Sequence, residues 1–330
     1  MTTSDSRIGR GTRSGPSYAE LPEAGGGSGE RYAWDVWGPG DELGTVNRIT
    51  PERVASAARL VRSGEVLSLS LPLNQPDPGL FENRAPYIRE ETRTNIGRED
   101  RLTHLDLQFS SQWDGLRHIR HKTAGYYGGR SDAEVDAGAL GIEKLARRGL
   151  VGRGVLVDVP GHFAATGREY WPDERIALKP RDVEEALERQ GTVLEDGDVL
   201  VIHTGWVDWY LALGEPDRQG LLGSVHGGDG GLACPGLVGS PDMAQWLWDA
   251  GLAAVASDNP TVEALPVRKE EGFLHRRVLP LLGMPFGELW SLGELARRCR
   301  ERGVYDFLLS SAPLDIPSGV ASPSNALAIL

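Results

Sequence analysis

Three short apolar runs, bounded by glycine, proline or charged residues, constrain the fold of this chain most strongly. They are Gly154–Val159 (GVLVDV), Asp198–Thr204 (DVLVIHT) and Leu252–Ser257 (LAAVAS). Continuous apolar runs of this length are typical of strands that are buried on both faces of a sheet. Between them lie two predicted helices, an amphipathic one over Arg181–Gln190 and one from Ser240 to Gly251. Strands that alternate with helices predict an α/β domain with a mixed, partly parallel sheet.

The flanking sequence predicts more elements of the same kinds. A helix is expected between Thr50, as its N-cap, and Gly64. Alternating apolar and polar residues predict strands over Val66–Leu73 and Leu102–Trp113. Ser291 and Glu294 have the spacing of a capping box for a helix that ends at Gly303.

The predicted elements fill one continuous region of the sequence. Residues 1–30 are rich in Gly, Ser and charged residues, lack apolar periodicity and are expected to form a flexible tail. Residues 31–330 contain no internal repeat and no linker-like segment. We therefore expect a single layered α/β domain over 31–330.

Charge, apolar run length and cysteine count argue against several classes of protein. The formal net charge of -12 disfavours nucleic-acid binding, and no apolar run approaches the roughly 20 residues that span a membrane. The N-terminal sequence lacks the apolar core of a secretory signal, and two cysteines, Cys234 and Cys299, cannot supply a disulfide framework. A cytoplasmic protein is expected. The 43 glycines include no phosphate-binding motif, so they are expected mainly in turns.

One polar segment stands out as a candidate site. In an extended chain, the side chains of Gln112, Asp114 and His118 would point to one face, because side chains alternate along a strand. An amide oxygen, a carboxylate and an imidazole would then converge, which suits a divalent cation with a base beside it. The alternative is an aspartate that caps a turn next to a structural histidine.

This segment resembles the signature H-x-G-T-H-x-D-x-P-x-H of the metal-dependent cyclase family, which includes bacterial kynurenine formamidases and isatin hydrolases. In the aligned stretch, Asp114 takes the place of the metal-binding aspartate and His118 that of the final, proton-transferring histidine. Gln108 and Gln112 replace the two earlier histidines, which indicates a branch with Q-W-D-x-L-x-H. Thr103-His104-Leu105-Asp106 copies part of the signature but lacks the residues that should follow, so His104 is expected to belong to a strand.

The resemblance extends, in order, over residues 31–330. The further segments that carry it are Trp37–Val54, Asp196–Trp206, Val255–Pro266, Leu274–Leu292 and Ser311–Ile329. It implies the swivelling β/β/α cyclase-like fold and a homodimer or homotetramer.

The resemblance also implies a metal site. His275 and Glu288 would complete it with Asp114, and Gln112 is a fourth candidate ligand. It implies one divalent ion, Mn²⁺ or Zn²⁺. The oxygen-rich ligand set favours either Mn²⁺ over tightly bound Zn²⁺ or a weakly bound metal that is lost on purification. Asp258 and Glu263, which follow an apolar run, are candidates to support the site or to form a turn.

The substrate pocket has further candidates, several of which are aromatic and suggest a small, flat or aromatic substrate. They are Trp113, His121, Tyr126, Tyr127, His162 and Trp206. His162 is included because it follows an apolar strand, and α/β sheets bind ligands at the carboxyl ends of their strands. Aromatic residues are also ordinary core residues, which is the alternative for this set.

Together these residues favour a metal-dependent hydrolase of a small amide, formamide or lactone. His118 would act as general base toward a water molecule and then as acid toward the leaving group. One alternative is a cyclase or dehydratase of secondary metabolism that closes a ring at the same site. Another is a non-catalytic binding protein with the same fold.

Overall fold

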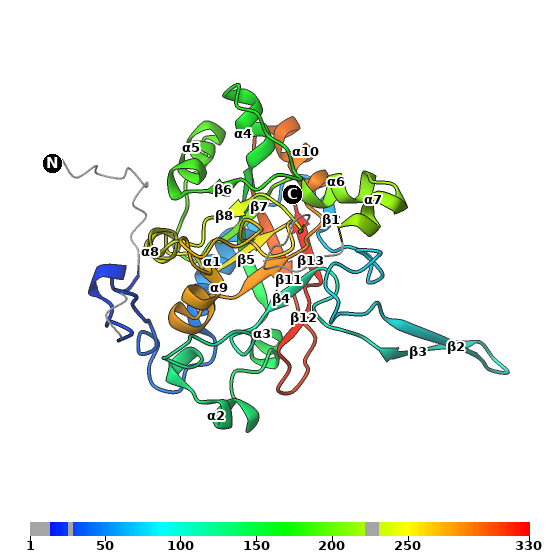
Figure 1. Ribbon diagram of the computed structural model, residues 1–330, viewed down its shortest axis with the longest axis horizontal. Coiled ribbons are helices and arrows are strands. Elements are labelled where there is room, and N and C mark those ends of the chain that lie inside the picture. The colour runs from blue at the N-terminus through cyan, green and yellow to red at the C-terminus, as the bar shows by residue number, and fades with distance from the viewer. Residues whose placement is uncertain (1–13, 26–28, 222–230) are drawn as a thin grey trace.

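A mixed nine-stranded sheet forms the centre of the protein in the computed structural model, which describes residues 14–25, 29–221 and 231–330 (Figure 1). In spatial order its strands are β1 (Val66–Ser68), β13 (Ala326–Ile329), β11 (Asp306–Ser311), β5 (Leu150–Asp158), β7 (Val199–His203), β9 (Ala254–Ser257), β10 (Phe286–Glu288), β4 (Gln112–Asp114) and β12 (Ala321–Pro323). A two-stranded parallel pair, β6 (Ala177–Leu178) with β8 (Gly236–Leu237), forms a separate small sheet.

The four strands β5, β7, β9 and β10 run parallel to one another, and the other pairings within the nine-stranded sheet are antiparallel. Three of the four are the apolar runs that the sequence singles out. The prediction of a single α/β domain with a mixed, partly parallel sheet is confirmed. Because β5, β7, β9 and β10 share one direction, their carboxyl ends lie at the same edge of the sheet.

Helices cover both faces of the sheet. The α-helices are α1 (Pro51–Ala58), α2 (Asp132–Asp136), α3 (Glu143–Arg148), α4 (Val159–Ala165), α5 (Pro180–Gln190), α6 (Trp206–Ala212), α7 (Glu215–Gly220), α8 (Pro241–Asp249), α9 (Leu274–Arg277) and α10 (Gly293–Arg302). Short 3₁₀ turns lie at Tyr18–Glu20, Gly44–Arg48 and Tyr127–Gly129, and a π-helical turn at Val278–Leu282 follows α9.

Alternation along the strands divides the core into two layers. Leu200 and Ile202 of β7 pack with residues of α4, α5, α8 and α9, whereas Val199 and Val201 pack with residues of α3 and α10. This division follows from the period of two along a strand, which sends successive side chains to opposite faces. The face that carries α9 also carries the candidate site.

Helix ends follow the sequence signals in part. The Thr50 and Ser240 hydroxyls accept hydrogen bonds from backbone N–H groups in the first turns of α1 and α8. The predicted capping box at Ser291 does not form, since α10 begins at Gly293 after Leu292. The helix expected to end near Gly64 already ends at Ala58, and the strand expected over Val66–Leu73 is limited to Val66–Ser68.

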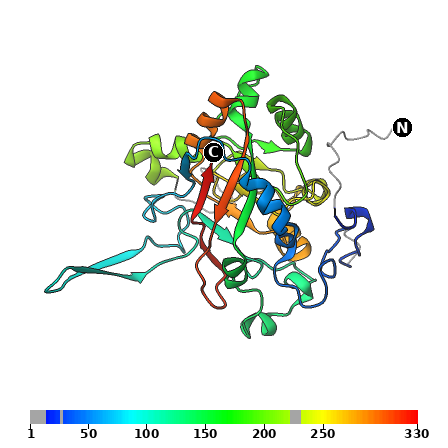
Figure 2. The ribbon, with the colours of Figure 1, turned by 180° about the vertical axis from the view of Figure 1, so that it is seen from behind.

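The strand predicted over Leu102–Trp113 is wrong. Its first residues belong to β3 (Arg98–His104), which pairs with β2 (Ile88–Arg93) in a hairpin that projects from the body of the protein (Figures 1 and 2). Its last residues belong to β4 of the central sheet. Apolar and polar residues alternate in both pieces, so the pattern did not reveal the turn between them.

Part of the expected flexible tail is packed against the domain. Tyr18 and Leu21 are buried, the Trp248 indole donates to the carbonyl oxygen of Pro16 (3.0 Å), and the Tyr18 N–H donates to Asp249 (2.8 Å). Because apolar side chains in this segment meet α8, the boundary at residue 30 does not mark the start of ordered structure. Residues 1–13 and 26–28 of the predicted tail lie outside the described residues.

The structure also bears on the expectations about membrane-spanning segments and about the two cysteines. In the part of the chain that the structure describes, no helix is both long enough and apolar enough to cross a bilayer. Cys234 and Cys299 are buried free thiols, and burial raises the pKa of each to about 12. Thiols in such surroundings are chemically inert.

Candidate metal centre

Strand register brings the carboxylates of the candidate site together. In the antiparallel pair of β10 and β4, Phe286 lies opposite Asp114 and Glu288 lies opposite Gln112. Side chains directly opposite in such a pair are neighbours on one face. Asp114, Gln112 and Glu288 therefore share the face that carries α9.

His275, in the first turn of α9, completes a compact group. Ligand atoms of Asp114, His275 and Glu288 all lie within 4.8 Å of one another, and the three residues are buried. His275 Nε2 lies 3.0 Å from Glu288 Oε1 and 3.9 Å from Asp114 Oδ2. The structure thus brings together the three ligands that the resemblance implies.

The chemistry of this group fits a divalent cation. Two carboxylates are buried side by side, and Asp114 Oδ2 has no hydrogen-bond partner among the described residues. Burial and the neighbouring Asp114 charge raise the pKa of Glu288. Because buried charges need a compensating partner, a cation held by two carboxylates and one imidazole would satisfy all three side chains, as the ligand preferences of Mn²⁺ and Zn²⁺ allow.

Glu263 holds His275 from the side opposite Glu288. Its carboxylate lies 2.5 Å from His275 Nδ1 and accepts the backbone N–H groups of Leu274 (2.8 Å) and His275 (2.9 Å). Burial lowers the pKa of His275, but the hydrogen bonds to Glu263 and Glu288 outweigh burial and raise this pKa to about 10. With Nδ1 engaged by Glu263, Nε2 faces the two other carboxylates.

The loop that carries Glu263 has a strained backbone. Val262 has a φ of 57°, in the left-handed region that β-branched residues rarely adopt. The Asn259 amide donates to the carbonyl oxygens of Glu263 (3.0 Å) and Pro235 (2.6 Å) and so braces the loop. Strain of this kind persists where the surroundings enforce it, often at functional sites.

The two glutamines contact the carboxylates. Gln112 Nε2 donates to Glu288 Oε2 (2.6 Å), and Gln108 Nε2 donates to Asp114 Oδ1 (2.5 Å). Gln112 Oε1 is buried and has no hydrogen-bond partner among the described residues. Both amides therefore orient oxygen ligands, and the role of Gln112 as a ligand itself stays a prediction.

His118 is a partly exposed polar group beside this cluster. Its Nε2 lies 3.5 Å from Asp114 Oδ2, and its side chain is 20% exposed, compared with 1% for Asp114. Burial lowers the pKa of His118, the Asp114 charge opposes this effect, and the charges of His275 and Arg84 add to the lowering. A neutral imidazole at neutral pH can accept a proton.

Trp113 is a correction to the predicted pocket. Alternation sends it to the opposite face of the sheet, where it is fully buried, packs edge-on against Trp290 at 5.0 Å and donates to Ser311 Oγ (2.8 Å). Tyr127 and Trp206 are also buried. The Tyr127 hydroxyl donates to Asp41 (2.9 Å), and Trp206 stacks on Tyr210 at 5.3 Å. The Trp206 indole nitrogen is buried and has no hydrogen-bond partner among the described residues, so the role of Trp206 in the pocket stays a prediction.

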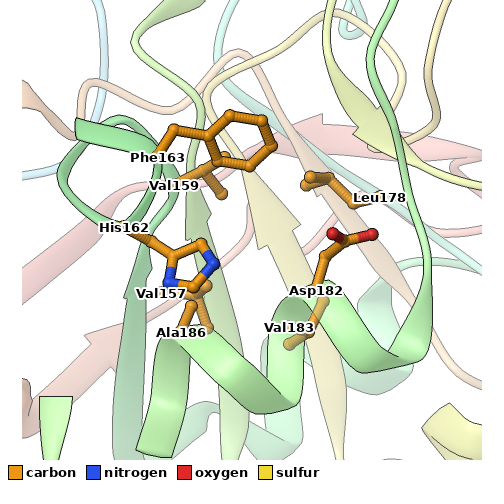
Figure 3. Close-up of a pocket in the computed structure, with 8 residues that line it drawn as sticks. All are labelled: Val157, Val159, His162, Phe163, Leu178, Asp182, Val183 and Ala186. Carbon is orange, nitrogen blue, oxygen red and sulfur yellow. The ribbon is translucent and has the colours of Figure 1, made fainter. Parts of the chain in front are cut away.

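The remaining pocket candidates lie apart from the three-ligand cluster. His162 lines a small, mostly apolar pocket between α4 and α5, where it sits near Phe163 and Asp182 (Figure 3). His121 Nε2 lies 3.1 Å from Glu30, and Tyr126 packs against the apolar cluster that contains Leu116, Tyr127, Val135 and Leu140. The structure shows none of these side chains in contact with Asp114, His275 or Glu288.

One charged residue near the site was not predicted. Arg84 Nη1 donates to the carbonyl oxygen of Gln108 (2.7 Å), and its guanidinium lies over the Phe81 ring at 4.6 Å. It belongs to a turn-rich segment between β1 and β2, which carries no motif and no periodicity. Only the folded structure brings it close to His118.

Comparison with known proteins places the chain in a family. A family model described as "Putative cyclase" matches residues 67–264, more than half of the chain. A crystal structure described as that of a novel cyclase is 32% identical, with a TM-score of 0.77, over 91% of this chain and 99% of that one. No curated protein matches the sequence.

More distant structures share the fold. Isatin hydrolase A from Labrenzia aggregata, bound to benzyl benzoate, is 16% identical with a TM-score of 0.58, over 84% of this chain and 97% of that one. Isatin hydrolase A from Ralstonia solanacearum is 16% identical with a TM-score of 0.57, over 84% and 95%. The family model and the 32% identical structure confirm the resemblance seen in the sequence, and the chain belongs to this cyclase family.

Proposed function

We propose that this protein is a metal-dependent hydrolase of a small amide, formamide or lactone. The observation that carries the proposal is the buried group of Asp114, His275 and Glu288, with the more accessible His118 beside it. Isatin hydrolases share the architecture that carries this group.

Asp114, His275 and Glu288 would hold one divalent ion, with Mn²⁺ as the preferred candidate. When bound, such an ion supplies a Lewis acid that polarises a carbonyl group and acidifies water. Glu263 fixes the His275 ring, and the amides of Gln108 and Gln112 fix one oxygen of each carboxylate. These contacts organise the ligands in advance.

His118 is the proton carrier in this proposal. Its neutral imidazole takes a proton from the attacking water, and the imidazolium then gives a proton to the leaving nitrogen or oxygen. Asp114, 3.5 Å from His118 Nε2, stabilises the imidazolium between these two steps. The Gln108 amide lies 3.4 Å from the same nitrogen and limits rotation of the ring.

Hydrolysis assays test the proposal directly. N-formylkynurenine, isatin and simple lactones are incubated with the protein and added Mn²⁺ or Zn²⁺. We expect metal-stimulated hydrolysis that Asp114→Ala and His118→Ala each reduce by about 100-fold or more. His104→Ala, on the exposed hairpin, is the matched control and keeps full activity. Equal rates in all four proteins would reject the assignment.

Ring closure is the second candidate, because the 32% identical structure is described as a cyclase. Hydrolysis adds one water molecule to the substrate, whereas ring closure with dehydration removes one. Mass spectrometry of products formed in ¹⁸O-labelled water distinguishes the two reactions. Stoichiometric metal binding without turnover of any substrate would instead support a non-catalytic binding protein.

The proposal extends to assembly and location. We propose a homodimer or homotetramer that binds small molecules and neither nucleic acid nor membranes. A cytoplasmic location suits its two buried free thiols. Sedimentation equilibrium measures the assembly, and a mass of one 35.8 kDa chain would contradict it.

A further inference from the structure

Arg84 forms no ion pair within the described residues, although the Asp106 carboxyl group is nearby. The Ala85 N–H donates to that carboxyl group, and this hydrogen bond, His104 and the Arg84 charge all lower its pKa. The one recorded hydrogen bond of Arg84 goes to a neutral acceptor, the carbonyl oxygen of Gln108, and its recorded ring contact is with Phe81. By contrast, buried Arg48 pairs with Asp196 at 2.6 Å.

The position of Arg84 connects it to the candidate metal centre. The Gln108 backbone accepts the Arg84 hydrogen bond, while the Gln108 side chain contacts Asp114 and His118. The Arg84 charge also acts on His118 and on Glu288. A positive charge therefore lies near His118 and Glu288.

Apolar side chains continue from Arg84. Phe81 packs against a buried apolar cluster that includes Leu289, the residue that follows Glu288. Trp209 and Val267 are other partly buried members at the edge of this cluster. The apolar cluster that Phe81 contacts thus includes a residue next to a candidate metal ligand.

We propose that Arg84 is a specificity-determining residue that binds the carboxylate of an anionic substrate with a flat apolar body. A guanidinium has five N–H donors in a rigid fork that matches a carboxylate, and the structure records one of them in use. The apolar edge at Phe81 suits an aromatic body. This inference rests on the proposed function and narrows its substrates to acidic aromatic amides or esters.

The competing explanation gives Arg84 a purely internal role. Its charge would then offset the buried carboxylates of Asp114 and Glu288. In that case Arg84→Gln changes metal affinity but does not change the discrimination between charged and neutral ligands.

Binding of benzoate and benzamide separates these explanations. Calorimetry measures both probes on the full chain with added Mn²⁺, for the unmodified protein, Arg84→Gln and Arg84→Lys. Arg101→Gln is the matched control, since its side chain is 76% exposed on the projecting hairpin. Thermal unfolding of each variant verifies that it is folded.

We expect Arg84→Gln to weaken benzoate binding tenfold or more and to leave benzamide binding unchanged. Arg84→Lys keeps the charge but loses the fork, so it should recover part of the benzoate affinity. The proposal would be overturned if the unmodified protein bound the two probes with equal affinity. It would also be overturned if Arg84→Gln lost the same factor of affinity for both probes.

Hydrolysis of 2-formamidobenzoate and formanilide separates failure of this inference from failure of the proposed function. A preference for the anionic formamide that disappears in Arg84→Gln supports both. Hydrolysis without such a preference overturns the role of Arg84 and retains the hydrolase. Arg84-dependent benzoate binding without hydrolysis of any substrate supports the carboxylate site and rejects the hydrolase.

Discussion

His275 shows how single residues prepare the candidate centre. One carboxylate, that of Glu263, accepts both its ring N–H and its backbone N–H, and the strained backbone at Val262 brings that carboxylate into position. Metal-binding histidines commonly donate their second ring nitrogen to such a group, which fixes the ring and strengthens the ligand. Glu263 is therefore a positioning residue.

Glu263→Gln is expected to weaken Mn²⁺ binding by about 10- to 100-fold, because the amide keeps an acceptor but loses the charge. Titration calorimetry measures the affinity. Glu99→Gln makes the same chemical change on the exposed hairpin and should leave the affinity unaltered. Equal affinities in Glu263→Gln and the unmodified protein would show that Glu263 serves the loop and not the metal.

Substitution of His118 should impair catalysis without impairing metal binding. His118→Gln is expected to lower kcat about 100-fold or more and to change Mn²⁺ affinity little, since His118 is not among the three ligands. The base must be neutral, and burial lowers its pKa from the ordinary 6.5, so kcat/KM should fall only at pH values below 6.5. A decline that begins above pH 6.5 would contradict the assignment of His118 as the base.

The sequence predicted the grouped candidate ligands better than their surroundings. Asp114 and His118 lie in a motif, and the family resemblance placed His275 and Glu288. Arg84 could not be found this way, because its relation to His118 exists only after the chain has folded. Trp113 failed as a pocket residue because Gln112 and Asp114 face the site, which forces the residue between them to the other side.

At the scale of elements, the apolar strands were predictable because burial on both faces leaves a continuous apolar run. The hairpin of β2 and β3 was not, since its strand residues are exposed and carry no signal of burial.

Charged groups also connect elements at the carboxyl edge of the sheet. His203 at the end of β7 lies 3.0 Å from Asp158 at the end of β5, and Arg300 of α10 pairs with the same carboxylate at 2.8 Å.

The charged groups at this edge should make the free energy of unfolding depend on pH. Burial lowers the pKa of His203, but hydrogen bonds to Asp158 and Asp208 outweigh it and raise the pKa to about 9, above the ordinary 6.5. A raised pKa in the folded state stabilises the protein fully below pH 6.5, and this contribution is lost as pH rises through 9. The pKa of Asp158 is lowered, so its own contribution is lost only in acid.

Urea unfolding of the unmodified protein and His203→Gln measures this contribution. The difference in free energy of unfolding should shrink by roughly 2–3 kcal/mol between pH 6.5 and 9.5, because glutamine does not titrate. A difference that stays constant over this range would mean that His203 is neutral in the folded protein.

At the scale of the whole molecule, the N-terminal segment that contains Tyr18 and Leu21 packs against α8. Tyr18 and Leu21 enter the same apolar cluster as Trp248 and Phe286, which lies on β10 next to the candidate centre. The sequence did not reveal this packing, because two isolated apolar residues in a polar segment form no periodic pattern. Their burial becomes apparent only against a surface built from distant residues.

Tyr18→Ala should therefore destabilise the domain by about 3 kcal/mol, as truncation of a buried aromatic side chain does. Tyr32→Ala is the control, since Tyr32 is only partly buried and lies outside this apolar cluster. Thermal and urea unfolding measure both variants. Equal stability of Tyr18→Ala and the unmodified protein would place the segment outside the cooperative unit.

The central claim is that Asp114, His275 and Glu288 form one metal site, and metal stoichiometry tests it most directly. The purified full chain is stripped with a chelator, and Mn²⁺ binding is then titrated by calorimetry and confirmed by elemental analysis. We predict one ion per chain in the unmodified protein and none in Asp114→Ala or Glu288→Ala, with both variants folded by circular dichroism. Binding of one ion per chain with unchanged affinity in both folded variants would contradict the account.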